Sequence, residues 1–268
     1  MPEDFGPEDF AHWIGRTVQS TDLVTTAPVA RLAATLDHDG GHWPAGGLPP
    51  LGHWLFHLPD AAQSELGSDG HPRKGGFLPP IAQARRMWAG GRLTFAAPIP
   101  IGAALVRRST IHAIEPKGAM TFVTVHHDLL IDNIVAVSEE QDIVYLPITA
   151  PAPPRPVERP APEHERRMVA DETMLFRFSA LTFNAHRIHY DLSYARDVEL
   201  YPGLVVHGPL QAMLLLDEAQ RMGERPSRFA FRGRAPLYAR RSFTIARAGA
   251  DWWIRDESGT VTMTATIA

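Results

Sequence analysis

The sequence predicts an α+β protein built from two related units of roughly a hundred residues each, in which an antiparallel sheet wraps around a helix. Three observations support this: a weak internal repeat, a strongly apolar helical segment, and a series of strand-like runs. The repeat consists of three pairs of similar segments that occur in the same order in both halves. The pairs are 30–37 with 176–183, 48–58 with 206–216, and 92–100 with 229–238.

The helical segment runs from Leu210 to Gln220. It consists of good helix formers and is apolar on most sides, which predicts a buried helix. The strand-like runs are rich in β-branched and aromatic residues with partial alternation, as in an antiparallel sheet with one wet face. Two such units side by side could form one continuous sheet. The runs are 121–128, 142–146, 242–246, 251–255 and 260–267. Within the first run, we interpret His126 and His127 as residues on the solvent-exposed face of the sheet.

A proline-rich stretch, residues 147–166, separates the two units. Repeated proline removes backbone donors and fixes φ, so this stretch cannot be a helix or a central strand. We expect an extended, exposed linker rather than a surface loop within one domain. The predicted units are therefore 1–146 and 167–268.

The composition excludes several classes of function. A formal net charge of −4 gives no sign of a nucleic-acid partner. The absence of cysteine excludes disulfides, thiolate nucleophiles and cysteine metal sites. No apolar run approaches the roughly 20 residues that span a bilayer, and the acidic segment 1–10 lacks the apolar core of a signal peptide. We expect a soluble, cytoplasmic protein with no membrane partner.

The strongest functional signal is a polar turn with two histidines, His186 and His189, followed by Gly208 at the start of the apolar helix. Histidine suits general acid and base catalysis near neutral pH. A free backbone N–H at a helix N-terminus can stabilise an oxyanion, and a residue without Cβ lets the substrate approach closely. This combination predicts chemistry on an acyl group such as a thioester.

The same segment resembles a known signature. Residues 184–189, followed by Asp191 and Ala195, resemble the hydratase motif of the MaoC-like family, with His189 in the place of its histidine. The pair His207-Gly208 resembles the His-Gly at the start of that family's central helix. Further strings look like the branch that holds type 2 hydroxyacyl-thioester dehydratases and the mesaconyl-C4-CoA and itaconyl-CoA hydratases. These strings are 75–80, 86–93 and 139–145.

The resemblance implies a double hot-dog fold and a hydro-lyase that adds water to, or removes it from, an α,β-unsaturated CoA thioester. A C5 dicarboxylyl-CoA, itaconyl-CoA or mesaconyl-C4-CoA, is the first expectation for the substrate. Three alternatives stay open. They are a 3-hydroxyacyl-thioester dehydratase of fatty-acid synthesis, an acyl-CoA thioesterase and a non-catalytic acyl-CoA-binding protein.

One position departs from the family pattern. Asn184 stands where the signature has a catalytic aspartate, and a carboxamide cannot accept a proton as a base. His189 is therefore expected to carry more of the proton transfer, with Asp191 or His186 as a local helper. His207 either helps in catalysis or only braces the loop before the helix.

The resemblance places the CoA or phosphopantetheine of the substrate along a groove between the halves, with no separate cofactor. Basic residues are the candidates for its phosphates and for a distal carboxylate. They are Arg73, Lys74, Arg187, Arg196, Arg232 and Arg234. The spacing His186-x-x-His189 could also suit zinc, but no matching ligand set accompanies it, so no metal is expected. The sequence leaves open a homodimer or a higher homo-oligomer.

Overall fold

The computed structural model describes residues 7–38 and 41–268, so most of the acidic segment 1–10 lies outside the described residues. The strands of the first half are β1 (Thr17–Leu23), β2 (Arg85–Phe95), β3 (Ala104–Lys117), β4 (Met120–Ile131) and β5 (Ile134–Leu146). Those of the second half are β6 (His164–Val169), β7 (Arg228–Gly233), β8 (Ser242–Ala248), β9 (Asp251–Asp256) and β10 (Val261–Ile267).

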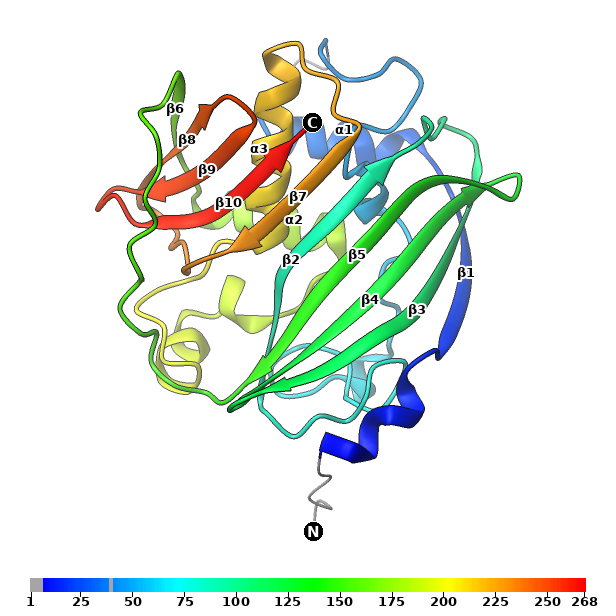
Figure 1. Ribbon diagram of the computed structural model, residues 1–268, viewed down its shortest axis with the longest axis vertical. Coiled ribbons are helices and arrows are strands. Elements are labelled where there is room, and N and C mark those ends of the chain that lie inside the picture. Colours follow the sequence, from blue (N-terminus) through cyan, green and yellow to red (C-terminus); the bar gives the residue numbers. More distant parts are fainter. Residues whose placement is uncertain (1–6, 39–40) are drawn as a thin grey trace.

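All ten strands form one antiparallel sheet in the order β1-β3-β4-β5-β2-β7-β10-β9-β8-β6. Each half contributes five neighbouring strands, and the pairing of β2 with β7 joins them (Figure 1). A Cβ on Gly90 of β2 would lie 2.6 Å from the carbonyl oxygen of Phe231 on β7, so a residue without a side chain is required at this junction. The predicted continuous sheet is confirmed.

The longer helices are α1 (Thr26–Thr35), α2 (Glu172–Thr182) and α3 (Gly208–Arg221). Short helical turns complete the structure: η1 (Pro7–Trp13), η2 (Gly52–Leu55), η3 (Gln63–Glu65), η4 (Arg187–His189) and the π-helical turn η5 (Tyr194–Val198). Two of the three pairs of similar segments form equivalent elements. Segments 30–37 and 176–183 overlap α1 and α2, and segments 92–100 and 229–238 overlap β2 and β7. Helix α1 packs against α2, and strand β2 pairs with β7. No helix of the described chain is both long and apolar enough to cross a membrane.

The two halves differ in their central helix. Pro209 lies in the first turn of α3, where its missing N–H costs no hydrogen bond, and the helix packs on β8, β9, β10 and β2. Nearly all its residues are buried, as predicted. The similar segment 48–58 forms only the four-residue η2. This shorter helix leaves room on the concave face of the first half's sheet, and that room becomes the cavity described below.

The proline-rich stretch is extended over residues 147–163, which form no helix or strand. Its last three residues, 164–166, instead begin the edge strand β6, which pairs with β8. No proline occurs within β6, so the backbone N–H groups needed for this pairing are present. The second unit thus starts at His164 rather than at residue 167.

Candidate functional site

A cavity of about 740 Å³ lies between the sheet of the first half and α2. One part of its wall comes from β3, β4, β5 and the segment 53–72. The other part comes from α2, from the turn that follows it, including Asn184 and Ala185, and from Pro209 at the start of α3. The tertiary structure therefore brings Asn184 of the polar turn and Pro209 of α3 to one cavity. His189 and Gly208 lie next to lining residues in the chain, at Tyr190 and Pro209, but are not themselves part of the lining.

His189, in η4, is held as a neutral base. Its Nδ1 lies 2.7 Å from the carbonyl oxygen of Val205. Because a carbonyl only accepts, Nδ1 carries the hydrogen and Nε2 keeps its lone pair. Burial of the ring, together with the nearby His207 and His186, holds the pKa of His189 well below its usual value. A neutral imidazole with an available Nε2 can take a proton from water.

His207 supports His189 from the side. The two rings stack with centroids 3.6 Å apart and an interplanar angle of 20°. His207 is fully buried, and its Nε2 lies 2.8 Å from Oγ of Ser179 on α2. Burial, with the nearby His186, lowers the pKa of His207 to about 3. This geometry suits the bracing role considered for His207.

Asn184 follows α2 and lines the cavity. Its Oδ1 accepts the backbone N–H of His186 at 2.9 Å, and its own backbone N–H donates to the carbonyl oxygen of Ser179 at 2.9 Å. Since Oδ1 is occupied, the side-chain NH₂ is the group that Asn184 can offer to a ligand. The side chain of Asn184 is thus oriented to donate a hydrogen bond to a ligand in the cavity.

His186 belongs to a buried chain of charges that the sequence did not predict. Its Nε2 lies 2.9 Å from Oε1 of Glu199, and Nε of Arg85 donates to Oε2 of Glu199 at 2.9 Å. Burial alone would raise the pKa of Glu199, but the hydrogen bond from His186 and the charge of Arg85 outweigh it and lower that pKa. Arg85 lies on β2, so this chain ties the polar turn to the first half.

The loop 67–72 of the first half presses directly on the polar turn. Gly70 has φ +89°, and a Cβ there would lie 1.8 Å from the carbonyl oxygen of Ala185, so only glycine fits. The carbonyl oxygen of Asp69 accepts the N–H of Arg187 at 2.9 Å. This contact brings His71 into the cavity wall, with its ring 4.2 Å from that of His186.

His71 is an imidazole of the cavity wall that lies two residues before Arg73, one of the basic residues considered for the phosphates. Oδ2 of Asp69 holds its Nδ1 at 2.9 Å, and burial lowers the pKa of His71 to about 4. Its neighbour Lys74 is also not available to a phosphate as predicted. The Nζ atom of Lys74 donates to the carbonyl oxygens of Ile81 and Gln83 within its own loop, which binds it to the protein.

Three further predictions need correction. Asp191 pairs with Arg187 at 2.7 Å and accepts the backbone N–H of Tyr194 at 3.0 Å, so it stabilises the turn rather than assisting His189 in proton transfer. Arg187 is occupied by this pair and by the carbonyl oxygen of Ser68. Arg196 is exposed, and its Nε donates to the carbonyl oxygen of Pro202. These three side chains do not line the cavity.

The remaining basic candidates lie on the surface. Arg73 and Arg232 are exposed, and Nε of Arg234 donates to the hydroxyl of Thr264 at 3.1 Å. Their role as contacts for the phosphates of CoA stays a prediction.

The cavity wall in the first half carries a buried polar group that the sequence analysis missed. Glu139 accepts hydrogen bonds from His53 at 2.9 Å, from Trp54 at 3.0 Å and from Gln141 at 2.9 Å. His127, interpreted from the sequence as solvated, is buried beside it, with Nδ1 2.7 Å from Oγ of Ser109. The interpretation was wrong because the burial of β4 alternates, and His127 lies on the buried face with Val123 and Val125, whereas His126 lies on the half-buried face.

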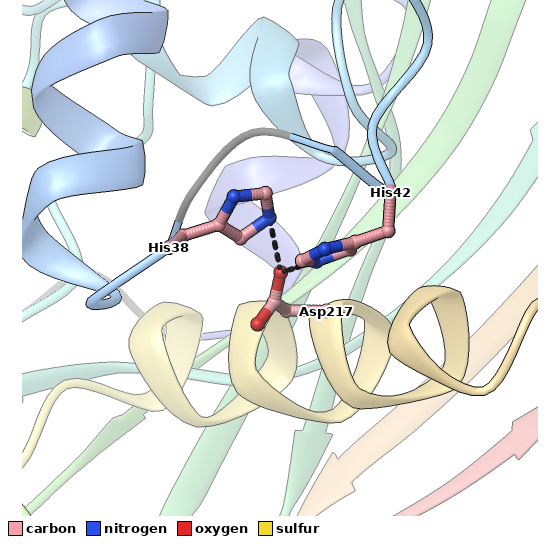
Figure 2. A group of neighbouring side chains, drawn as sticks. All are labelled: His38, His42 and Asp217. Carbon is pink, nitrogen blue, oxygen red and sulfur yellow. Dashed lines mark hydrogen bonds and ion pairs between the residues drawn. The ribbon is translucent and has the colours of Figure 1, made fainter.

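Among residues 7–38 and 41–268, one group of potential metal ligands comes together, and it lies on a later turn of α3 than the helix start. Figure 2 shows His38 and His42 converging on Asp217 of α3. Oδ1 of Asp217 lies 2.9 Å from Nε2 of His42 and accepts from Trp43 at 3.1 Å, while Arg221 donates to Oδ2 at 2.8 Å. The guanidinium already balances the carboxylate, so the group serves as an ion-pair cluster that anchors the loop to α3.

The buried histidines make stability depend on pH. Their folded pKa values lie below the unfolded value of about 6.5, so the unfolded chain binds more protons as the pH falls below that value. Their contribution to stability is complete above pH 6.5 and is lost as the pH falls toward about 4. Burial is the main cause at each of them. They are His57, His71 and His127, each at about 4, and His207 at about 3.

We therefore expect the free energy of unfolding, measured by urea denaturation at constant ionic strength, to change little from pH 7.5 to pH 6.5 and to fall from pH 6.5 to pH 5. Replacing His207 by Asn should make that slope shallower, because one of the titrating groups is removed. The matched replacement of the exposed His112 should leave the slope unchanged. An unfolding free energy that is independent of pH over this interval would contradict the assignment of these histidines as neutral.

Comparison with known proteins agrees with this geometry. The family model described as hydroxyacyl-thioester dehydratase type 2 matches residues 49–239. The chain is 48% identical over 254 residues to the mesaconyl-C(4)-CoA hydratase of Chloroflexus aurantiacus, covering 91% of this chain and 90% of that protein. It is 28% identical to the mitochondrial hydroxyacyl-thioester dehydratase type 2 of Schizosaccharomyces pombe, covering 84% of this chain and 87% of that one.

Solved structures show the same fold. HtdX of Mycobacterium tuberculosis superposes with a TM-score of 0.66 at 18% identity, covering 94% of this chain and 99% of that one. A MaoC-like dehydratase of Phytophthora capsici gives a TM-score of 0.70 at 11% identity, with 95% of each chain covered. A further protein of M. tuberculosis with a double hot-dog fold gives 0.56 at 12% identity, covering 95% of each chain. The double hot-dog fold expected from the sequence is confirmed.

Proposed function

Because this chain belongs to the hydroxyacyl-thioester dehydratase type 2 family, as its sequence motifs suggested, we propose that it is a hydro-lyase acting on an α,β-unsaturated CoA thioester. The observation that carries the proposal is the state of His189 beside the cavity. Its Nδ1–H is committed to Val205, its pKa is depressed, and its Nε2 is available as a base.

In the proposed reaction, Nε2 of His189 takes a proton from water as the water oxygen bonds to the β-carbon. The electron pair of the carbon–carbon double bond moves toward the thioester carbonyl and forms an enolate. The imidazolium then returns its proton to the α-carbon, so one water is added in total and the base is regenerated. Asn184 offers its NH₂ to the water or the thioester, and His71 lies in the same wall.

Gly208 is the proposed donor to the enolate oxygen. Its N–H is in the first turn of α3, where helix N–H groups have no intrahelical acceptor and the helix dipole is positive. A Cβ at this position would meet only the carbonyl oxygen of Trp88, at 3.6 Å. Packing within the protein therefore does not require glycine here, and the open space is left for a thioester. This chemistry needs no cofactor beyond the CoA of the substrate.

For the acyl group we propose a C5 dicarboxylyl-CoA of the mesaconyl-C4-CoA or itaconyl-CoA type. The similarity to the hydratase of C. aurantiacus supports this choice. The wider family name supports a 3-hydroxyacyl thioester as the second candidate.

A screen of purified protein against a set of enoyl-CoA esters tests the proposal. The loss of enoyl absorbance is followed with mesaconyl-C4-CoA, itaconyl-CoA, crotonyl-CoA and a long-chain 2-enoyl-CoA. We expect the highest kcat/KM with a C5 dicarboxylyl ester and no release of free thiol. Thiol release would identify a thioesterase, and binding with no absorbance change for any ester would identify a non-catalytic binding protein.

A further inference from the structure

We propose that Arg107, assisted by His57 and His127, binds the free carboxylate of the acyl group and so selects dicarboxylyl-CoA substrates. The proposal rests on the function proposed above and assigns its specificity to one wall of the cavity. Arg187 and Arg196, two of the basic candidates that lie near the polar turn in sequence, are not part of the cavity lining.

Arg107 lies on β3 and lines the cavity from the sheet of the first half. The strand registers bring its neighbours to the same face: Ser109 lies opposite His127, and His127 lies opposite Glu139. Because side chains two residues apart share a face, Arg107 and Ser109 point the same way. Asn184 and His71 line the same cavity, so one acyl group can contact both walls.

The guanidinium of Arg107 lacks a partner. Its Nε atom is buried, and no atom of the described residues accepts a hydrogen bond from it. No carboxylate among residues 7–38 and 41–268 forms an ion pair with it either. Arg107 as a whole is half-buried, but its Nε is shielded from water and has no acceptor among the described residues. An unsatisfied donor of a charged group in a cavity wall is unfavourable, so it indicates an anion supplied by the ligand.

The two carboxylates close enough to influence Arg107 are already occupied. Asp22 accepts the backbone N–H of Leu23 at 2.7 Å and that of His57 at 2.8 Å. Glu139 accepts three hydrogen bonds from the side chains around it. Neither therefore needs Arg107 as a donor, and the arginine stays available to a bound carboxylate.

The two histidines add uncharged hydrogen-bonding groups beside this cation. Nδ1 of His57 lies 2.9 Å from Oγ of Ser20, while its Nε2 is buried with no partner among the described residues. If the Ser20 hydroxyl donates to Nδ1, then Nε2 carries the hydrogen and can donate. Burial and the charge of Arg107 lower the pKa of His57 to about 4, and burial lowers that of His127 to about 4. The wall therefore holds one unpaired positive charge with polar neighbours.

The test compares Arg107→Gln with the matched control Arg108→Gln. Arg108 is the next residue of β3 and is exposed, so both variants lose one positive charge from the same strand. Binding is measured by calorimetry with two saturated, unreactive esters, 2-methylsuccinyl-CoA, which carries a free carboxylate, and isovaleryl-CoA, which does not. Activity is measured with mesaconyl-C4-CoA and crotonyl-CoA.

We expect Arg107→Gln to weaken binding of 2-methylsuccinyl-CoA by about 100-fold and to lower kcat/KM for mesaconyl-C4-CoA to a similar extent, as for a broken buried charge pair. Binding of isovaleryl-CoA should change less than about threefold, since it offers no carboxylate to lose. Arg108→Gln should behave as the unmodified protein, and Arg107→Lys should recover part of the loss because it keeps the charge without the planar fork.

The outcomes separate this inference from the function on which it rests. An equal loss with both saturated esters, or no loss with either, would overturn the role of Arg107 while leaving a hydratase intact. An equal loss would assign the arginine to CoA itself. If the unmodified protein bound 2-methylsuccinyl-CoA through Arg107 but hydrated none of the enoyl esters, the proposed function would fail and the carboxylate site would stand. Thermal unfolding of each variant checks that it is folded.

Discussion

Replacing His189 by alanine is expected to lower kcat for hydration by ~100- to ~10,000-fold, the range typical of a lost general acid or base. In the proposed mechanism the same imidazole removes the proton from water and returns it to the α-carbon, so both steps lose their catalyst. The effect on KM should be small, because the carbonyl donor at Gly208 and the cavity wall are retained. Steady-state kinetics with mesaconyl-C4-CoA measure both parameters.

Two further variants control this experiment. His112 is an exposed histidine on β3, and its replacement by alanine should leave kcat unchanged. His189→Gln keeps most of the side-chain volume beside His207 and removes the base, so a loss of kcat in this variant cannot come from a packing defect alone. A folded His189→Ala protein with near-normal kcat would remove His189 from the mechanism.

The second large effect is expected at Arg85, on stability. Its side chain is 4% exposed and donates to Oε2 and to the backbone carbonyl oxygen of Glu199, and to the carbonyl oxygen of Thr149 at 3.1 Å. Arg85→Met leaves the carboxylate of Glu199 buried with His186 as its remaining partner. Breaking a buried pair on one side costs about 3–5 kcal/mol, so the free energy of unfolding should fall by about that amount.

The matched control is Arg92→Met, on the same strand. Arg92 also pairs with two carboxylates, Glu140 at 2.7 Å and Asp142 at 2.7 Å, but its side chain is 49% exposed. Exposed pairs contribute about 1 kcal/mol or less, so urea denaturation should show a much smaller change for this variant. Equal destabilisation by the two substitutions would show that the burial of the Arg85 pair has no special effect.

The double variant Arg85→Met with Glu199→Leu distinguishes the cost of the unpaired Glu199 carboxylate from the loss of the contacts made by the Arg85 side chain. It removes the uncompensated carboxylate together with the arginine, so it should be more stable than Arg85→Met alone. It should still reduce kcat, because His186 loses the carboxylate that orients it beside His189. A double variant no more stable than the single one would argue against an unpaired charge as the cause.

Local patterns predicted the sheet and the buried helix well. The β-branched and aromatic runs became β4, β5, β8, β9 and β10, and the apolar run became α3. These features follow from residues close in the sequence, whose burial and backbone preference do not depend on a distant partner. The reduced central helix of the first half was not foreseen, because its segment 48–58 is similar to 206–216 in apolar residues and contains one additional proline, with Pro49 and Pro50 adjacent.

The sequence by itself determined the family, the repeated unit, the polar turn that holds Asn184 and His189, and Gly208 at the start of the apolar helix, because these depend on short local motifs. Tertiary structure alone decided which charges face the cavity. Arg187 and Asp191 lie beside the motif yet bind each other, whereas His71 and Arg107 lie far from it in sequence and line the cavity. The physical reason is that the burial and the ion-pair partners of a charged side chain decide whether it can bind a ligand. Both depend on contacts between the halves, which cannot be read from the spacing of residues along the chain.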